Sequence, residues 1–200
     1  MPLVPSDIIV TGARVFLAPI GSTLPLPTLA VGAAWPTGWV DVGFTLSPTK
    51  LTYKFDMLEI FVEQSFSPVR RRRTKEEVTI ETELAEHTAG NLAITMAGTA
   101  TTTAATSTVV GYEEFEVGGD PNLPLHMVGI EGGYNDESDN FFPVRLFLYK
   151  ATVTDGGTLE YGKDKPAGIP IKLAALPDLT KAVGGQLLKL QRVTDPHTTV

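Results

Sequence analysis

The sequence predicts a mainly β fold, a β-sandwich or partly open barrel that contains one short α-helix. Three observations predict this class: apolar and polar residues alternate over many short segments, turn residues separate these segments, and only one stretch has a helical period. The chain has 200 residues, which is enough for one domain with a sizeable core. We therefore expect residues 1–200 to form a single β domain.

The clearest strand is the segment 76–84. Its side chains alternate between an apolar face and a polar face, as expected for a strand with one face in water. The apolar face carries Val78, Ile80, Thr82 and Leu84, and the polar face carries Thr79, Glu81 and Glu83.

The short helix is expected within residues 88–98. Its apolar stripe recurs at i, i+3, i+4, i+7 and i+8 and consists of Ala89, Leu92, Ala93, Met96 and Ala97. Thr88 is a better N-cap than His87, and Gly98 is expected to end the helix in the left-handed conformation. Because Gly90 costs about 1 kcal/mol relative to Ala, packing against the rest of the domain must hold this helix.

The remaining segments follow from the same alternation and turn signals. The expected strands are 8–17, 40–46, 49–55, 58–66, 109–117, 125–132, 141–154, 166–176 and 187–193. The segment 141–154 is apolar on both faces, which predicts a central strand. Residues 99–108 are rich in Thr and Ala, which predicts a flexible connector or a poorly ordered strand lead-in, and 194–200 is expected to be a flexible tail.

A long loop rich in Pro and Gly is expected at 18–38. Loops of this length usually carry a function or wrap a neighbour. Trp35 lies within it and Trp39 directly follows it. Two interpretations are open: both rings cover one edge of the core, or at least one lies at a subunit contact, where Trp is enriched.

The composition excludes several classes of function. A formal net charge of −7 argues against a general nucleic-acid binder. The absence of cysteine excludes disulfides, thiolate catalysis and cysteine metal sites. The first residues lack the basic region of a secretory signal, and no apolar run reaches the roughly 20 residues of a membrane helix. We expect synthesis in a cytoplasm and no membrane association.

The sequence contains no recognisable catalytic constellation. Nucleophile elbows, phosphate loops and zinc-binding helices are absent. The three histidines are isolated from one another in the sequence, at His87, His126 and His197. We therefore expect no enzyme, no catalytic residue and no cofactor.

One acidic loop has part of a metal-binding pattern. Asn135, Glu137 and Asp139 have the spacing that opens a calcium loop. Asn140 stands where that loop needs Gly, and Leu146 stands where it needs a bidentate Glu. The pattern therefore favours a solvated acidic loop without a metal.

Five stretches, taken in order, make up a pattern that extends over much of the chain. The pattern is a first strand, a strand ending near Gln64 with a Pro-Val turn, a charged strand, a helix with an Asn-Leu pair, and a late strand. The stretches are Thr11–Pro19, Phe61–Arg70, Val78–Glu86, Asn91–Ile94 and Ile169–Asp178. In order and spacing they resemble the tail tube proteins of long-tailed, siphovirus-like bacteriophages.

The resemblance implies a structural virion protein. It implies hexameric rings that stack into a hollow tail tube, whose inner wall is a continuous β-barrel built from all subunits. DNA would pass through the lumen to the host without specific binding. The implied partners are copies of the chain itself, the tape-measure protein, and the tail terminator and tail tip proteins. The protein would be made in the bacterial cytoplasm and reside in the phage tail.

The basic run Arg70, Arg71, Arg72 and Arg73 has several interpretations. A nucleic-acid site lacks interleaved aromatic residues, and a solvated turn is the simplest alternative. The resemblance implies a third interpretation, in which an extended loop or hairpin around 47–75 reaches the next ring. The arginines would then meet acidic residues there, with Asp136, Glu137 and Asp139 as candidates.

Two acidic groups are candidates for the lumen. A negative wall would repel phosphates, so that DNA slides rather than binds. The first group is Glu81, Glu83 and Glu86, and the second is Glu113, Glu114 and Glu116. Ordinary solubility charge explains both groups equally well.

A different class of function remains as an alternative. The chain could be a soluble β-sandwich module that binds a carbohydrate or another surface ligand. Such a module usually has a platform of aromatic residues, for which Trp35 and Trp39 are the candidates.

Overall fold

The computed structural model describes residues 12–135, 140–164 and 166–194. Over these residues the protein is mainly β, with ten strands and one helix. The elements in chain order are β1 (Arg14–Pro19), β2 (Val40–Asp41), β3 (Lys50–Ile60), β4 (Arg70–Leu84), α1 (Ala89–Thr95), β5 (Thr99–Thr103), β6 (Tyr112–Glu116), β7 (His126–Asn135), β8 (Phe141–Val153), β9 (Ile169–Ala175) and β10 (Leu188–Arg192). The predicted mainly β class with one short helix is confirmed.

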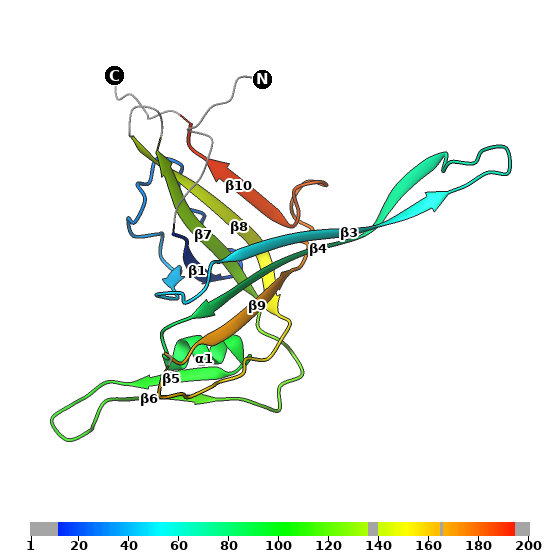
Figure 1. The fold of residues 1–200 in the computed structure, drawn as a ribbon. Helices are drawn as coiled ribbons and strands as arrows, with labels where there is room; N and C mark the ends of the chain where they lie inside the picture. The colour runs from blue at the N-terminus through cyan, green and yellow to red at the C-terminus, as the bar shows by residue number, and fades with distance from the viewer. Residues whose placement is uncertain (1–11, 136–139, 165, 195–200) are drawn as a thin grey trace.

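The strands form one large antiparallel sheet and one small one (Figure 1). The large sheet has the order β2-β1-β7-β8-β9-β4-β3, and β10 pairs with β8 outside this path. β5 and β6 form the separate two-stranded sheet. Among the described residues the large sheet does not close into a barrel, because its two end strands, β2 and β3, do not pair with each other. β8 pairs with β10 along its first half and with β9 only at its end, so the sheet branches there.

β8 is the central strand, as its two apolar faces predict. β7 pairs with one edge of β8 over most of its length, and β10 and β9 share the other edge. Each face of β8 contributes to a different hydrophobic cluster, through Leu148 on one side and Phe147 on the other.

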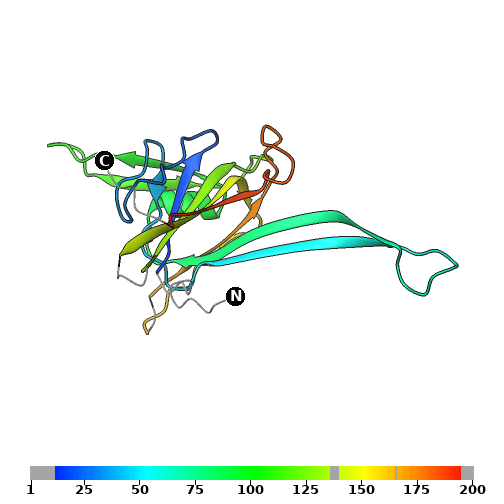
Figure 2. The ribbon, with the colours of Figure 1, turned by 90° about the horizontal axis from the view of Figure 1, so that it is seen from above.

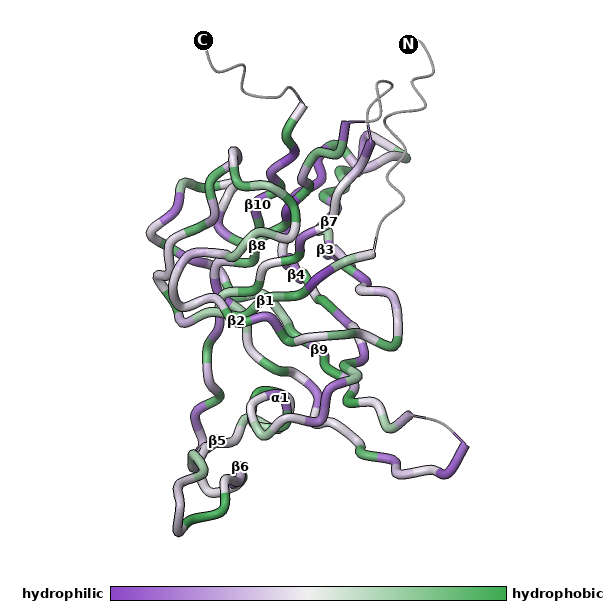
Figure 3. The backbone as a smooth tube through the Cα atoms, turned by 90° about the vertical axis from the view of Figure 1, so that its left-hand side faces the viewer, coloured by the Kyte–Doolittle hydropathy of each residue, from purple (hydrophilic) through white to green (hydrophobic). Residues whose placement is uncertain are grey.

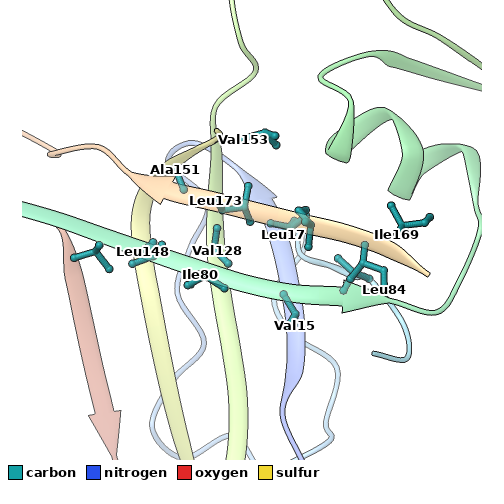
Figure 4. Close-up of a cluster of buried hydrophobic side chains, with 13 residues drawn as sticks. Val15, Leu17, Ile80, Leu84, Val128, Leu148, Ala151, Val153, Ile169 and Leu173 are labelled. Carbon is teal, nitrogen blue, oxygen red and sulfur yellow. The ribbon is translucent and has the colours of Figure 1, made fainter. Parts of the chain in front are cut away.

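The main core lies inside the curve of the large sheet. Side chains of β1, β7 and β8 pack against side chains of β4 and β9, as Figure 4 shows for ten labelled members of the cluster. On β4 these are the residues of the predicted apolar face, including Val78, Ile80 and Leu84. Leu92 and Ile94 of α1 pack against the cluster, so the helix closes one end of the core.

A smaller core lies on the opposite face of β1, β7 and β8. There the 20–39 loop lays Trp35 on the sheet between Phe16 and Phe147, and Trp39 packs against the edge of this group. Trp35 is 9% exposed. The interpretation that these rings cover the core is therefore confirmed, with Trp35 as its buried member.

The β3–β4 hairpin differs from the expectation. The segments 49–55 and 58–66 were expected as two strands, but 50–60 form the single strand β3. The four arginines do not form a turn: they begin β4, and Arg70 pairs with Ile60. The turn lies at 61–69 instead. Cross-strand neighbours such as Glu59 reduce the repulsion between the arginines, which lets a run of like charges stay in a strand.

Three further expectations need correction. The expected strand 40–46 is only two residues long as β2. Residues 99–103 were expected to be poorly structured but form β5, in keeping with the preference of β-branched Thr for strands.

The third correction concerns the end of the helix. The Thr88 side chain accepts a hydrogen bond from the N–H of Asn91, which confirms the predicted N-cap. The left-handed residue is Ala97, with φ 53°, rather than Gly98. The N–H of Gly98 donates to the carbonyl of Ala93 at 2.7 Å, which is the 6→1 bond of a Schellman motif. Gly98 is needed for a different reason, because a Cβ there would overlap the carbonyl oxygen of Glu116.

Candidate assembly surfaces

The outer part of the β3–β4 hairpin projects from the body as an arm (Figures 1 and 2). We define this arm as residues 56–75. It begins at a β-bulge: Asp56 pairs with Lys75 and Met57 with Arg73, so Thr74 is the extra residue. The Thr74 hydroxyl donates to the Asp56 carbonyl across the bulge. Bulges increase strand twist, which here lets the arm turn relative to the sheet that carries it.

The arm exposes many apolar side chains. The N–H of Val69 donates to the carbonyl of Ile60 at 2.9 Å, which closes the last rung before the tip. The exposed apolar residues are Met57, Leu58, Ile60, Phe61, Val62, Phe66 and Val69. A two-stranded ribbon without a covering layer gains little stability from its own side chains. A concentration of exposed apolar residues on it therefore indicates a surface that contacts another molecule.

The strand register divides the four arginines between the two faces of the arm. Arg71 lies opposite Glu59 and forms an ion pair with it at 2.7 Å. Arg73 forms an ion pair with Glu76 at 2.6 Å and donates to the Tyr53 hydroxyl at 2.7 Å. The hydrogen bond with Glu76 raises the pKa of Arg73. Both arginines on this face are therefore neutralised within the hairpin.

Arg70 and Arg72 lie on the other face of the arm. The register places Arg72 beside Leu58 and Arg70 beside Ile60, and directly opposed residues point to the same side of a sheet. Within the described part of the chain neither arginine has an ion-pair partner. We call Leu58, Ile60, Arg70 and Arg72 the cationic arm face. The candidate partners Asp136, Glu137 and Asp139 lie outside the described residues.

The outward face of the sheet at the base of the arm is a row of alternating charges. Lys50 of β3 lies opposite Glu81 of β4, which in turn lies opposite Lys172 of β9. The Lys172 ammonium and a Glu81 carboxylate oxygen are 2.9 Å apart. This hydrogen bond lowers the pKa of Glu81 and raises the pKa of Lys172. Glu81 is thus on the predicted wet face, but as part of a mixed-charge surface.

The other two acids of this group are at the end of β4 and just beyond it. Glu83 lies against Gly168, where a Cβ would overlap its carboxylate. Glu86 accepts a hydrogen bond from the N–H of Phe44 at 3.0 Å and lies against Gly43. Glu86 therefore holds the 41–44 backbone in place.

The second acidic group divides between the two faces of the β5–β6 sheet. Glu113 faces α1, where its carboxylate accepts a hydrogen bond from the N–H of Ala89 at 3.0 Å. Glu114 and Glu116 alternate with it in β6 and are exposed. The candidate lumen acids thus divide between the end of β4 with the residues just beyond it and the separate β5–β6 sheet.

The outer edge of β3 offers backbone groups for pairing. Among the described residues β3 pairs with β4 on one side, and no strand covers its other edge. Unpaired sheet edges bind further strands unless they are protected. β10 likewise pairs only with β8 within the described chain.

The sequence patterns did not identify a buried ion pair. Arg145 of β8 and Glu131 of β7 lie opposite each other with fully buried side chains, 2.9 Å apart. Glu131 also accepts from the Trp35 indole N–H, and Arg145 donates to the carbonyls of Leu26, Leu29 and Ala30. The pair thus fastens the 20–39 loop to the sheet. The sequence signal that could have indicated this ion pair was the single arginine in the most apolar strand of the chain.

The described residues were expected to hold no metal. Among them no group of three or more His, Asp or Glu side chains is placed to hold a metal ion. His126 is half-buried, and burial lowers its pKa. In this part of the chain no helix is long and apolar enough to cross a membrane.

The fold and its surfaces define a class of structural β protein that exposes an apolar, cationic arm and an open sheet edge. A model of the phage tail tube protein family matches residues 1–183, and the chain belongs to this family. A search of curated proteins finds no match. The protein is therefore a structural component of the phage tail.

Proposed function

We propose that this protein polymerises as stacked hexameric rings into the hollow tail tube through which phage DNA reaches the host. The observation that carries the proposal is the projecting arm, whose apolar residues are exposed and whose Arg70 and Arg72 have no ion-pair partner within the described chain. Family membership supports the tube, and the sixfold symmetry follows the resemblance in the sequence.

Within a ring, the edges of the large sheet would join neighbouring subunits. The free edge of β3 from one copy would pair with a free strand edge of the next. Such a contact joins two different surfaces, so it closes into a ring when the rotation between copies allows it. The sheets of all copies would then form the continuous inner barrel.

Between rings, the arm would reach the adjacent subunits. Its exposed residues would be buried there, and its arginines would meet acidic residues of the neighbour. Asp136, Glu137 and Asp139 are the acids that the sequence offers for this role.

The lumen would be lined by the outward face of β3, β4 and β9. This face carries three cations and three acids, Lys50, Lys54 and Lys172 with Glu77, Glu81 and Glu83, so its charge is mixed rather than uniformly negative. A wall without excess cations lets DNA slide past. Glu83, Glu86, Glu113, Glu114 and Glu116 remain candidate contributors. The tape-measure protein would occupy the lumen before ejection, and terminator and tip proteins would cap the ends of the tube.

Negative-stain electron microscopy of the purified chain tests the proposal. Hollow cylinders of uniform width are the expected result. Monomers at high concentration would contradict it and favour the alternative of a soluble binding module. That alternative has lost its aromatic platform, because Trp35 is buried in the core.

A further inference from the structure

Strand β4 is polarised in charge along its length. It spans Arg70–Leu84, and its first six residues include five cations, whereas its remaining nine include four glutamates and no cation. The cations lie on the arm, and the last glutamate, Glu83, lies at the far end of the strand, near α1 (Figure 1). One continuous strand therefore presents opposite charges at opposite ends of the molecule.

Two cations of the arm have no counterion among the described residues. On the cationic arm face, Arg70 and Arg72 have no ion-pair partner among the described residues, unlike Arg71 and Arg73 on the other face. The two arginines flank a small apolar surface formed by Leu58 and Ile60. A partner for this face must offer carboxylates and an apolar contact together.

The opposite end of β4 carries a hollow with this chemistry. The hollow has a volume of ≈ 760 Å³, and it lies between the end of β4, the start of β9 and the loop that precedes β9. Figure 3 shows the described part of this loop, residues 154–164 and 166–168, projecting from the body with hydrophilic residues toward its end. The lining includes Glu83, Glu160, Tyr161, Asp164 and Pro170, with Lys163 as the cation among its described residues.

The arm of a given molecule cannot reach its own hollow. Arg72 and Glu83 are eleven residues apart in the same strand, and a strand rises ~3.3 Å per residue, which separates them by roughly 36 Å. The ribbon that joins them is hydrogen-bonded along both strands. The two surfaces therefore cannot meet within one molecule, and a second copy of this chain supplies an occupant of complementary charge.

We propose that the cationic arm face of one copy docks in the acidic hollow of the copy in the next ring. Arg70 and Arg72 would face Glu160 and Asp164, with Glu83 behind them, and Leu58 and Ile60 would contact Tyr161 and Pro170. This inference rests on the proposed tube and names the partner surface of the arm. The contact is head-to-tail, so it repeats without closing and generates a stack. The axial repeat between rings would be on the order of 36 Å, the separation of the two ends along β4.

A charge-swap experiment tests the contact. The variants are Arg70→Glu/Arg72→Glu, Glu160→Lys/Asp164→Lys, and the combination of all four, which restores the net charge. All four side chains are exposed, so each variant is expected to keep the circular dichroism spectrum of the wild type. A matched control, Asp120→Lys/Asp155→Lys, changes the charge equally at two exposed loop residues that do not line the hollow.

The expected readout is the fraction of protein in tubes, from sedimentation and electron microscopy. Each double variant should lose this fraction by about tenfold or more, the combination should recover it, and the control should match the wild type. Normal tubes from Glu160→Lys/Asp164→Lys would overturn the inference and leave the proposed tube intact. Recovery of the arm variant by reversing Asp136, Glu137 and Asp139 would also overturn it. Absence of tubes from the wild type would refute the proposed function itself.

Discussion

At the scale of single residues, Gly129 decides how the 20–39 loop can pack. It lies in β7 directly beneath the Trp35 ring, and a Cβ at this position would overlap the ring. Phe16 stacks on the same ring with centroids 4.0 Å apart. The Trp35 ring can therefore pack directly on the backbone of β7 because residue 129 has no side chain.

Gly129→Ala is expected to destabilise the protein by about 1–3 kcal/mol, because the added methyl group overpacks a filled site. Urea denaturation followed by tryptophan fluorescence measures the change. Gly156→Ala is the matched control, since a Cβ at that exposed glycine meets no atom within 4 Å. Equal stability of Gly129→Ala and the control would contradict the packing described for Trp35.

Arg145→Ala is expected to cost about 3–5 kcal/mol. The substitution leaves the Glu131 carboxylate buried without its partner, and it removes the donors that hold three carbonyls of the 20–39 loop. Arg71→Ala breaks an exposed pair on the arm and should cost less than about 1 kcal/mol. Chemical denaturation of both variants gives the comparison, and similar losses would show that the buried pair has no special role.

At the scale of elements, two neighbouring residues at the end of α1 are constrained for different reasons, one by its backbone conformation and the other by the space beside it. Ala97 adopts a positive φ without being glycine, whereas Gly98 is needed for the close approach of β6. A left-handed conformation costs an ordinary L-residue roughly 1–2 kcal/mol.

Ala97→Gly is therefore expected to stabilise the protein by up to about 1 kcal/mol, because glycine adopts positive φ without strain. Gly98→Ala should destabilise it, because its Cβ overlaps the Glu116 carbonyl. Thermal unfolding of the two variants provides the test. A gain in stability from Gly98→Ala would contradict the close approach of β6, and a loss from Ala97→Gly would contradict the strain at residue 97.

The pair Glu81–Lys172 joins β4 to β9 and should give a pH-dependent contribution to stability. The pKa of Glu81 is lowered, so its contribution is present above the unfolded-state pKa and is lost as pH falls through the folded-state pKa. The pKa of Lys172 is raised, so its contribution is present below the unfolded-state pKa and is lost as pH rises through the folded-state pKa. The pair therefore contributes its full stabilisation only above the unfolded-state pKa of Glu81 and below the unfolded-state pKa of Lys172.

Lys172→Met should abolish this pH dependence. The measurement is the difference in urea midpoint between Lys172→Met and the wild type as a function of pH. The difference should be small, because both groups are exposed to solvent, and it should shrink further at high salt. A difference that stays constant from pH 3 to pH 8 would argue against the pair.

At the scale of the whole molecule, the arm and the body have separate roles. The buried core draws on β1, β4, β7, β8 and β9, and no residue of the arm belongs to it. The arm is therefore expected to add little to the stability of one molecule, in keeping with the proposal that it joins rings.

Replacing residues 57–74 by Asn-Gly should leave the body folded and prevent tube formation. The new turn connects Asp56 and Lys75, which already pair, and Asn-Gly favours a two-residue hairpin. The free energy of unfolding should change by no more than a surface substitution changes it, about 0.5 kcal/mol. Electron microscopy should show rings or monomers in place of tubes. Long tubes from this variant would mean that the arm does not join the rings.

The sequence by itself determined the local features of this protein. The alternation in 76–84 gave the buried face of β4, the two apolar faces of 141–154 gave the central strand, and Thr88 gave the start of the helix. These features depend on residues close together in the chain, and their periodicity is visible directly.

Only the tertiary structure decided the features that depend on pairing between distant segments. The arginine run resembles a turn until Ile60 and Glu59 are placed opposite it in β3. The same register separates Arg71 and Arg73, which have partners, from Arg70 and Arg72 on the other face. The Arg145–Glu131 pair and the need for glycine at 129 likewise exist only once β7, β8 and the 20–39 loop are brought together. Sequence periodicity reports which face of a strand is buried, whereas partners across strands are fixed by register, which only the folded chain sets.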